Sequence, residues 1–556
     1  MATNGLEKHP KGLYALFATE MWERFSFYSM LALFTLYLRD PVEGFGWTAA
    51  EATGLYANYL MFVYASPLIG GLIADKITGY RKAVMIGGFF FMAGHGLLSI
   101  PAIWAVYLAL TCLVIGNGFF KPNVSTMVGN LYPEGSHLKD RAYNIFYMGI
   151  NVGAWVAPIV MEIVKAYFGF HAAFAVAAFG MVFSVAILWY FKDIVEGKPK
   201  DALIIGEHVI ENIGAKRGEA EMSPDAAATA VDAPPHGISG QDDLNAAKAR
   251  LMDAVPDWKR IAALIVIFLI VIVFWMVFHQ NGSTLTYWAD DNTAWNVTGT
   301  ISNSINPFWI IVLTFPLVWF WGFLDKRGKE PSTPTKMAIG MTLTGLSFFV
   351  LYFAATQGEG QKPTADQLAA GSFRINERVV TNLKADGVPE DLLNKIMAAK
   401  DKDDKNIVND VKFSATEDEA TKQKMTGEQN LIATIDKIAP GEGTKHKDKF
   451  LARAYLFQVS PFWLLLAYAI ISLGELMLSP MGLSLVSKVA PIRMRGLLMG
   501  GWFVATAIGN KLTMIGIYWS IWYQSSFFIV LGSAALVMAV VLFALLKPLK
   551  KAMPGV

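Results

Sequence analysis

The stretch Glu20-Met21-Trp22-Glu23-Arg24-Phe25-Ser26-Phe27-Tyr28 places two carboxylates and one guanidinium inside an apolar run over about residues 13–38. A helix rises about 1.5 Å per residue, so a helix over this run is long enough to cross a bilayer core of roughly 30 Å. Spacings of three and four residues place Glu20, Glu23 and Arg24 on one helix face, where opposite charges can pair. An unpaired charge near the middle of a bilayer costs about 2.5–3.5 kcal/mol. This cost favours a functional role for the three residues over an ion pair that only fixes the helix register.

The composition of the whole chain is typical of a membrane protein. Of its 556 residues, 54% are hydrophobic and only 17% are charged, which is too apolar for a soluble protein of this length. The net charge of +2 gives no excess that would indicate binding to nucleic acid. The single cysteine, Cys112, excludes an intrachain disulfide and a multi-cysteine metal site, and its apolar neighbours predict a packing role. The polar N-terminus leads into a full-length span without a small-residue cleavage site, so we expect no removable signal peptide.

Hydropathy predicts twelve membrane-spanning helices, six in each half of the chain. Lysines and arginines gather in alternate loops, which predicts that both termini are cytoplasmic. The first six spans are expected near residues 13–38, 48–74, 82–101, 103–130, 142–167 and 171–192. The other six are expected near residues 260–289, 301–325, 335–356, 459–488, 494–522 and 524–547.

Two polar segments divide the chain further. The cytoplasmic segment has a part rich in Ala and Pro that cannot form a core, so we interpret it as a linker between the two halves. The predicted organisation is a six-helix bundle (1–192), the linker (193–258), spans seven to nine (259–356), an external insert (357–456), and the last three spans with a cytoplasmic tail (457–556).

The external insert is rich in Lys, Asp, Ala and Thr and poor in aromatic residues. Short helices are predicted over Pro389–Ala399 and Glu417–Met425, the second capped by Thr416. The sequence leaves open whether the insert is a small helical domain or a mostly solvated loop.

Six spans, a linker and six more spans are typical of two-bundle secondary transporters, whose substrate site lies near the midplane between the halves. The loop after the second span, Gly71-Leu72-Ile73-Ala74-Asp75-Lys76, continues to Gly79, Arg81 and Lys82. It resembles the loop signature of the major facilitator superfamily. The expected fold is therefore that of an all-α membrane protein with two six-helix bundles.

Two further charged residues lie inside predicted spans, one in each half. Lys121 lies in the fourth span close to the depth of Glu23, so it could pair with that carboxylate, and protonation of Glu23 would free the lysine for an anionic group. Glu475 lies near the middle of the tenth span, and pairing with Lys511 is the alternative to a ligand-binding role. A ligand with an amine at one end and a carboxylate at the other would satisfy both halves.

Several motifs together resemble one family within this superfamily. The stretch over residues 20–28 is similar to the ExxERFxYY signature of the proton-dependent oligopeptide transporters. Residues 146–153 look like the second signature of that family, and Lys-Pro-Asn at 121–123 and Gly-Glu-Leu at 474–476 also fit. The resemblance implies a proton-coupled symporter that imports di- and tripeptides, acts as a monomer, and needs no cofactor or metal.

The resemblance also implies a role for each candidate residue. Arg24 and Lys121 would face the carboxylate of the peptide, and Asn151 and Glu475 would face its amine. The proton-coupling set is Glu20, Glu23, Arg24, Lys121 and His279, and the substrate-binding set is Arg24, Tyr28, Tyr64, Lys121, Asn151, Trp275 and Glu475.

Aromatic residues complete the predicted pocket. Tyr28 and Tyr64 would bond the peptide backbone, which fixes the register of the ligand and leaves its side chains loosely specified. Trp275, Trp288 and Trp502 are candidates for the walls of side-chain pockets, although a tryptophan in a span more often packs or anchors the membrane interface.

Three features depart from the family pattern. Phe27 replaces the first tyrosine of the signature pair, which removes one hydroxyl. His279 stands in the seventh span where the family usually has Glu or Asp, and it is either a proton-sensitive partner, a donor to substrate, or a neutral core histidine. The insert over 357–456 is the third departure, since its helix-leaning composition does not suggest the β fold of animal relatives.

Two other functions remain possible from the sequence. A transporter of nitrate or other anions would share the fold, although the paired glutamates argue against it. A peptide sensor that does not transport is the second alternative, and no Ser-His-Asp order, HExxH or P-loop spacing supports an enzyme. The expected location is a cell membrane, with a bacterial inner membrane suggested by the short loops and the missing targeting signal.

Overall fold

The structure is a computed structural model that describes residues 9–132, 138–195, 255–295, 298–417, 424–491 and 494–554. Most of the predicted linker, residues 196–254, lies outside the described residues. Among the described residues, eight helical stretches are long and apolar enough to cross a membrane. The chain is therefore a multi-pass helical membrane protein.

The N-terminal half follows the predicted spans closely. The span expected over residues 48–74 is divided at Pro67, which begins a new helix where its missing N–H is not needed. The elements are α1 (Lys11–Arg39), α2 (Ala49–Ala65), α3 (Pro67–Ile73), η1 (Ala74–Thr78), α4 (Tyr80–Leu97), α5 (Ile103–Asn130), α6 (Leu138–Tyr190) and α7 (Lys192–Val195).

A glycine joins two predicted spans within α6. Gly169 has φ 81°, a left-handed conformation that side chains other than hydrogen rarely adopt, and the helix direction changes there. The carboxylate of Glu43 accepts a hydrogen bond from the Phe170 N–H at 2.7 Å, and a Cβ on Gly169 would lie 2.4 Å from Glu43 Oε2. The backbone angle thus favours glycine here, and any other residue would also displace the Glu43 carboxylate.

The C-terminal half contains helices that are interrupted at two places. The seventh predicted span unwinds after Phe278 into a 3-10 turn, and the eleventh ends in a longer 3-10 segment. The elements are α10 (Asp257–Phe278), η3 (His279–Gly282), α11 (Thr284–Asp291), α12 (Gly299–Asp325), α13 (Thr333–Glu359), α20 (Pro461–Val489), α21 (Arg495–Leu512), η5 (Thr513–Ser520) and α22 (Gln524–Ala552).

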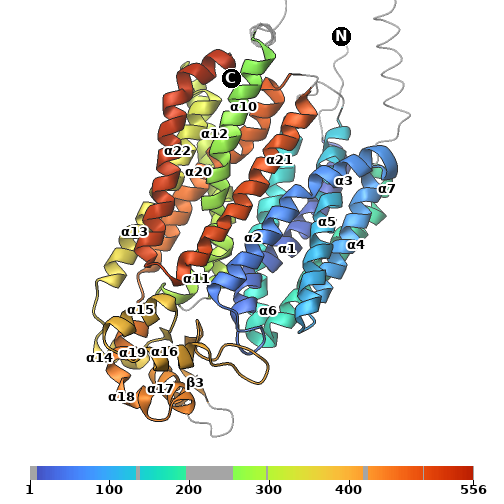
Figure 1. The fold of residues 1–556 in the computed structure, drawn as a ribbon. Helices are drawn as coiled ribbons and strands as arrows, with labels where there is room; N and C mark the ends of the chain where they lie inside the picture. The colour runs from blue at the N-terminus through green and yellow to red at the C-terminus, as the bar shows by residue number, and fades with distance from the viewer. Residues whose placement is uncertain are drawn as a thin grey trace, which may run out of the picture.

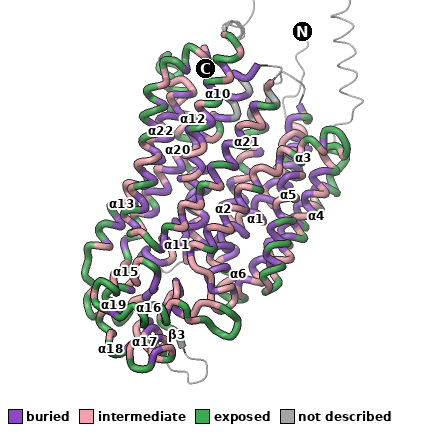
Figure 2. The backbone as a smooth tube through the Cα atoms, in the orientation of Figure 1, coloured by how far each residue is buried: buried purple, intermediate pink, exposed green. Residues whose placement is uncertain are grey.

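The two halves have separate apolar cores. One cluster of buried side chains comes from residues between Leu13 and Val195, and the other comes almost entirely from residues between Ala263 and Met553. Figure 1 shows the two groups of helices side by side, the first in blue and cyan and the second from green to red. The exposed positions follow the outer faces of the helices (Figure 2). On α12 these include Phe315, Trp319 and Phe320, which suits a lipid-facing surface.

Residues between α13 and α20 form a small domain, which lies at the end of the molecule away from the C-terminus (Figure 1). Its buried side chains, such as Phe373, Leu431 and Phe450, form a third apolar core. It is thus a packed domain and not a solvated loop. Its elements are α14 (Ala365–Ala370), β1 (Phe373–Arg374), α15 (Glu377–Ala385), α16 (Glu390–Met397), β2 (Lys412–Phe413), β3 (Thr416–Glu417), β4 (Lys424–Met425), α17 (Gly427–Ile438), α18 (Glu442–Lys445) and α19 (Lys447–Ala454).

One helix prediction in this domain is confirmed and one is wrong. The helix predicted from Pro389 is α16, which has this proline as its N-cap. The helix predicted over Glu417–Met425 is wrong at both ends, because Thr416 and Glu417 pair in an antiparallel ladder with Met425 and Lys424, and its residues 418–423 lie outside the described residues. The next helix begins instead after Thr426, whose capping box satisfies the first N–H groups of α17.

Candidate functional site

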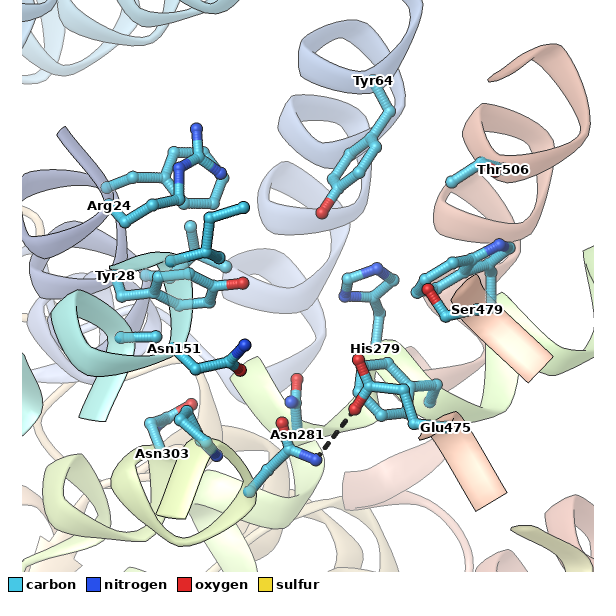
Figure 3. Close-up of a pocket in the computed structure, with 18 of the residues that line it drawn as sticks. Arg24, Tyr28, Tyr64, Asn151, His279, Asn281, Asn303, Glu475, Ser479 and Thr506 are labelled. Carbon is cyan, nitrogen blue, oxygen red and sulfur yellow. Dashed lines mark hydrogen bonds between the residues drawn. The ribbon is translucent and has the colours of Figure 1, made fainter. Parts of the chain in front are cut away.

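A cavity of about 290 Å³ lies between the two halves. Its walls come from α1, α2, α5 and α6 on one side and from α10, η3, α12, α20 and α21 on the other. Figure 3 shows Arg24, Tyr28 and Asn151 facing Glu475 and His279 across this space. His279 also lines the cavity. So do all of the residues predicted to bind substrate, which are Arg24, Tyr28, Tyr64, Lys121, Asn151, Trp275 and Glu475.

Behind the cavity wall, Arg24 holds two buried carboxylates. Its Nη2 donates to Glu23 Oε1 at 2.6 Å, and its Nε pairs with Glu23 Oε2 and lies 3.4 Å from Glu20 Oε1. Glu20 and Glu23 are 1% and 0% exposed and are not in the cavity lining, so Arg24 connects them to it. Glu20, Glu23 and Arg24 are therefore in contact, as their spacing predicts, and of these three only Arg24 lines the cavity.

Lys121 has a different neighbour from the one predicted. Glu23 pairs with Arg24 and not with Lys121, and the Lys121 Nζ lies 4.8 Å from the centroid of the Tyr64 ring. The adjacent position of Arg24 in α1 explains the difference, since its guanidinium reaches both oxygens of Glu23. Lys121 is thus left for a partner inside the cavity.

The structure also explains why phenylalanine suits position 27. The Arg24 Cζ lies 4.7 Å from the centroid of the Phe27 ring, and Phe27 lines the cavity. An aromatic face beneath a guanidinium attracts the cation. The ring of Phe27 thus stabilises the Arg24 guanidinium by a cation–π contact, and this contact needs no hydroxyl.

His279 lies at the point where α10 unwinds. Its ring stacks on Trp275 with centroids 5.1 Å apart, and its centroid lies 5.6 Å from that of Tyr64. The side chain is 6% exposed, and its Nε2 has no protein partner among the described residues. The ring therefore lines the cavity and also carries a buried nitrogen that makes no hydrogen bond within the described part of the chain, which is unusual for a histidine that only packs in a core.

Glu475 is anchored by an amide and not by a cation. Asn306 Nδ2 donates to Glu475 Oε2 at 3.0 Å, the bond dashed in Figure 3, and to Ser472 Oγ at 2.9 Å. The alternative partner Lys511 bonds to Asn58 Oδ1 of α2 instead, so the pairing of Glu475 with Lys511 is wrong. The second oxygen of Glu475 remains for a cationic group of a ligand.

The cavity is closed toward the small domain by contacts between the halves. Thr35 Oγ1 donates to the Gly282 carbonyl at 3.1 Å, and the hydroxyls of Thr53 and Tyr287 lie 3.3 Å apart. The Lys165 Nζ donates to Thr300 Oγ1 at 3.2 Å. The structure thus represents a state that is shut on this side.

A sequence model described as the POT family matches residues 81–376 and 432–527, which is more than half of the chain. The chain belongs to the POT family. This agrees with the resemblance that the signature motifs predict.

Relatives of this POT chain match it along nearly its full length. "Uncharacterized transporter YclF" of Bacillus subtilis (strain 168) is 27% identical over 580 residues and covers 99% of this chain and 96% of its own. The "Di-/tripeptide transporter" of Lactococcus lactis subsp. lactis (strain IL1403) is 24% identical over 585 residues, with 98% and 97% covered. A crystal structure of a peptide transporter POT in complex with sulfate has a TM-score of 0.65 and 26% identity, with 100% of this chain and 98% of that chain covered.

Sequence reasoning missed three asparagines of the POT cavity. Asn281, Asn303 and Asn306 all line it, and Asn303 Nδ2 donates to Thr286 Oγ1 at 3.0 Å. An asparagine inside an apolar span is itself a weak signal for such a site, as with Asn306, which precedes a proline in α12. Of the candidate tryptophans, Trp275 and Trp502 line the cavity, whereas Trp288 packs on Phe457 and Phe528.

Proposed function

We propose that this protein is a symporter that uses the inward proton gradient to import di- and tripeptides by alternating access. The observation that carries the proposal is the charge pattern of the cavity. Arg24 and Lys121 line it from the N-terminal half, and Glu475 lines it from the C-terminal half. A free peptide carries an anionic and a cationic end and is complementary to both walls.

The dimensions of the cavity agree with a short peptide. Its volume of about 290 Å³ is near the lower end of the range of roughly 300–1,000 Å³ that is typical of small-molecule sites. Arg24 and Lys121 would bind the carboxylate, Glu475 and Asn151 the amine, and the tyrosines at 28 and 64 the backbone. The name of the Lactococcus relative, a di-/tripeptide transporter, supports the same substrate class.

Proton coupling follows from the group around Arg24. When Glu20 or Glu23 takes up a proton, its attraction for Arg24 weakens, and the guanidinium becomes available to the peptide carboxylate. Lys121 and His279 complete the set that responds to protons. Each charge moved through about 100 mV is worth about 2.3 kcal/mol, which is enough to drive uptake against a gradient.

The same proposal covers the arrangement in the membrane. It assigns twelve spanning helices in two six-helix bundles, residues 1–192 and the combined segments 259–356 and 457–556, with the fold of the major facilitator superfamily. The linker over 193–258 and both termini would be cytoplasmic, and the insert over 357–456 would be external. A monomer in a bacterial inner membrane is the proposed working form, since the relatives compared above are bacterial.

Uptake into proteoliposomes tests the function. With an imposed inward proton gradient, the wild-type protein is expected to concentrate labelled dialanine, and Glu23→Gln and Lys121→Ala are expected to abolish this accumulation. Lys437→Ala, which removes an exposed lysine of the small domain, is the matched control. Dialanine that binds but never accumulates would indicate a sensor, and the absence of both binding and uptake would direct the test to nitrate and other anions.

A further inference from the structure

The small domain is firmly attached to the C-terminal half. Both of its ends continue into helices of that half, α13 and α20. Arg374 Nη2 donates to Asp291 Oδ1 at 2.9 Å, and Lys412 Nζ donates to the Asp290 carbonyl at 2.7 Å. Arg378 Nη1 adds a bond of 2.9 Å to the Trp522 carbonyl.

One loop of this domain, residues 401–412, crosses to the N-terminal half. We call it the latch loop. Its Lys405 Nζ donates to the carbonyl of Pro41 at 3.1 Å, and its Asn406 Nδ2 donates to the carbonyl of Gly46 at 2.9 Å. These carbonyls belong to the connection between α1 and α2, so the loop holds the ends of both helices (Figure 1).

Asp410 is the centre of the contact between the halves. Its Oδ2 accepts a hydrogen bond from the Ala49 N–H at the start of α2 at 2.5 Å, and its Oδ1 lies 3.4 Å from Arg39 Nη2 at the end of α1. From the C-terminal half, Ser520 Oγ donates to Oδ2 at 3.4 Å. Within its own domain, Arg374 holds the backbone carbonyl of Asp410.

The charged side chains around Asp410 are buried, and the arginines Arg39 and Arg374 lie against the carboxylates of Asp410 and Asp291. Asp410 is 3% exposed, Arg39 8% and Arg374 7%. Burial alone would lower the pKa of Arg374, but Asp291 and Asp410 raise it above its ordinary value. Removal of one member of such a group leaves a buried charge without its partner, which is costly.

We propose that the latch loop keeps the side of the cavity nearest the small domain shut, with Asp410 as the residue that connects the two halves. The inference rests on the alternating access of the proposed function. Opening on this side must move the ends of α1 and α2 away from η5 and the small domain, and thus break the ion pair of Asp410 with Arg39 and its hydrogen bond with the Ala49 N–H. The small domain therefore sets the fraction of molecules that open toward it.

Distances between spin labels test the latch without any substrate. Tyr167→Cys beside the break of α6 at Gly169 and Phe462→Cys at the start of α20, in a Cys112→Ser background, place labels on exposed positions of the two halves. Double electron–electron resonance is expected to show one short distance between the two labels in the otherwise wild-type protein. Asp410→Asn is expected to raise the ratio of open to shut molecules by about tenfold, because the amide can still accept from the Ala49 N–H but no longer carries the charge that attracts Arg39.

Asp404 offers a matched control in the same loop. Asp404 and Asp410 have nearly the same left-handed backbone, with φ of 61° and 62°, which asparagine also tolerates. The side chain of Asp404 is 85% exposed and pairs only with Lys400 among the described residues. Asp404→Asn is therefore expected to leave the distances unchanged.

Two outcomes would overturn the latch. One is an unchanged distance distribution in an Asp410→Asn variant that unfolds at the wild-type temperature, and the other is an equal shift in Asp404→Asn. If Asp410→Asn does not fold, the same distances are measured in the double variant Lys405→Ala with Asn406→Ala. This variant removes contacts to the connection between α1 and α2 and leaves the buried charges in place, and unchanged distances in it would overturn the latch. Dialanine uptake is measured separately, so failure of transport and failure of the latch are distinguishable.

Discussion

Removal of the charge of Glu475 should erase the preference of the protein for peptides with a free amine. Glu475→Gln keeps the size of the side chain and can still bond to Asn306, so the cavity is expected to keep its shape. What changes is the electrostatic attraction for a cation. A comparison of dialanine with N-acetyl-dialanine isolates that attraction, because the acetyl group removes the charge of the ligand amine.

The size of the effect follows from the surroundings of Glu475. One oxygen is bonded to Asn306, and within the described part of the chain we find no lysine or arginine paired with the carboxylate. The ligand amine would thus be its sole cationic partner in a largely enclosed site. Loss of one partner of a buried charge pair costs about 2–5 kcal/mol. We therefore expect Glu475→Gln to weaken dialanine binding at least about thirtyfold and to leave the weak binding of N-acetyl-dialanine nearly unchanged.

Equilibrium titration of purified protein with both ligands measures the two affinities without the need for transport. Glu377→Gln, which changes an exposed glutamate at the start of α15, is the control for the loss of one carboxylate and is expected to behave as wild type. If Glu475→Gln still prefers dialanine over the acetylated form by the wild-type factor, Glu475 does not bind the amine, and the proposed orientation of the peptide is wrong.

The other predictions concern helix packing and the proton-sensitive group. Gly153→Ala would place a Cβ 2.4 Å from the carbonyl oxygen of Met21, so α1 and α6 would have to move apart. The free energy of unfolding, measured by thermal unfolding, should fall by about 1–3 kcal/mol. Gly54→Ala, with no atom within 4 Å of its Cβ, is the control and should not lose stability. His279→Gln cannot take up a proton, so its uptake should rise less steeply than wild type as the external pH falls from about 7 to about 5.5. An unchanged pH profile, matching that of the control His446→Gln, would contradict a role for His279 in proton coupling.

Charged residues inside apolar spans made the centre of the site predictable. Arg24, Lys121 and Glu475 stand out because a bilayer makes each unpaired charge expensive, and all three line the cavity. Hydropathy alone also places a helix over residues 103–130, where α5 is found. The break in α6 at Gly169 also falls between two predicted spans.

The hydropathy and charge pattern of the sequence did not predict which side chains contact each other. Depth in the membrane suggested that Lys121 pairs with Glu23, but depth does not show that the neighbouring Arg24 already occupies both oxygens of that carboxylate. Asn281 and Asn303 carry no charge, so they cost less to bury and attract less notice in a hydropathy scan. The ladder of β3 and β4 was missed because its strands have only two residues each, too few for a periodic pattern.

The cavity and the latch loop act on the same variable, the distance between the two halves. A peptide in the proposed orientation joins Arg24 and Lys121 to Glu475 at the centre of the molecule, and Asp410 joins Arg39 and Ala49 to the small domain at one end. The latch must open before a peptide can enter from that end, and the bound peptide then supplies a second attraction between the halves as they close again. A ligand that lacks either charged end would enter the cavity without supplying that attraction. Selection for zwitterionic peptides would then act on the closing step as well as on binding, because only a ligand that attracts both halves favours the return to the shut state.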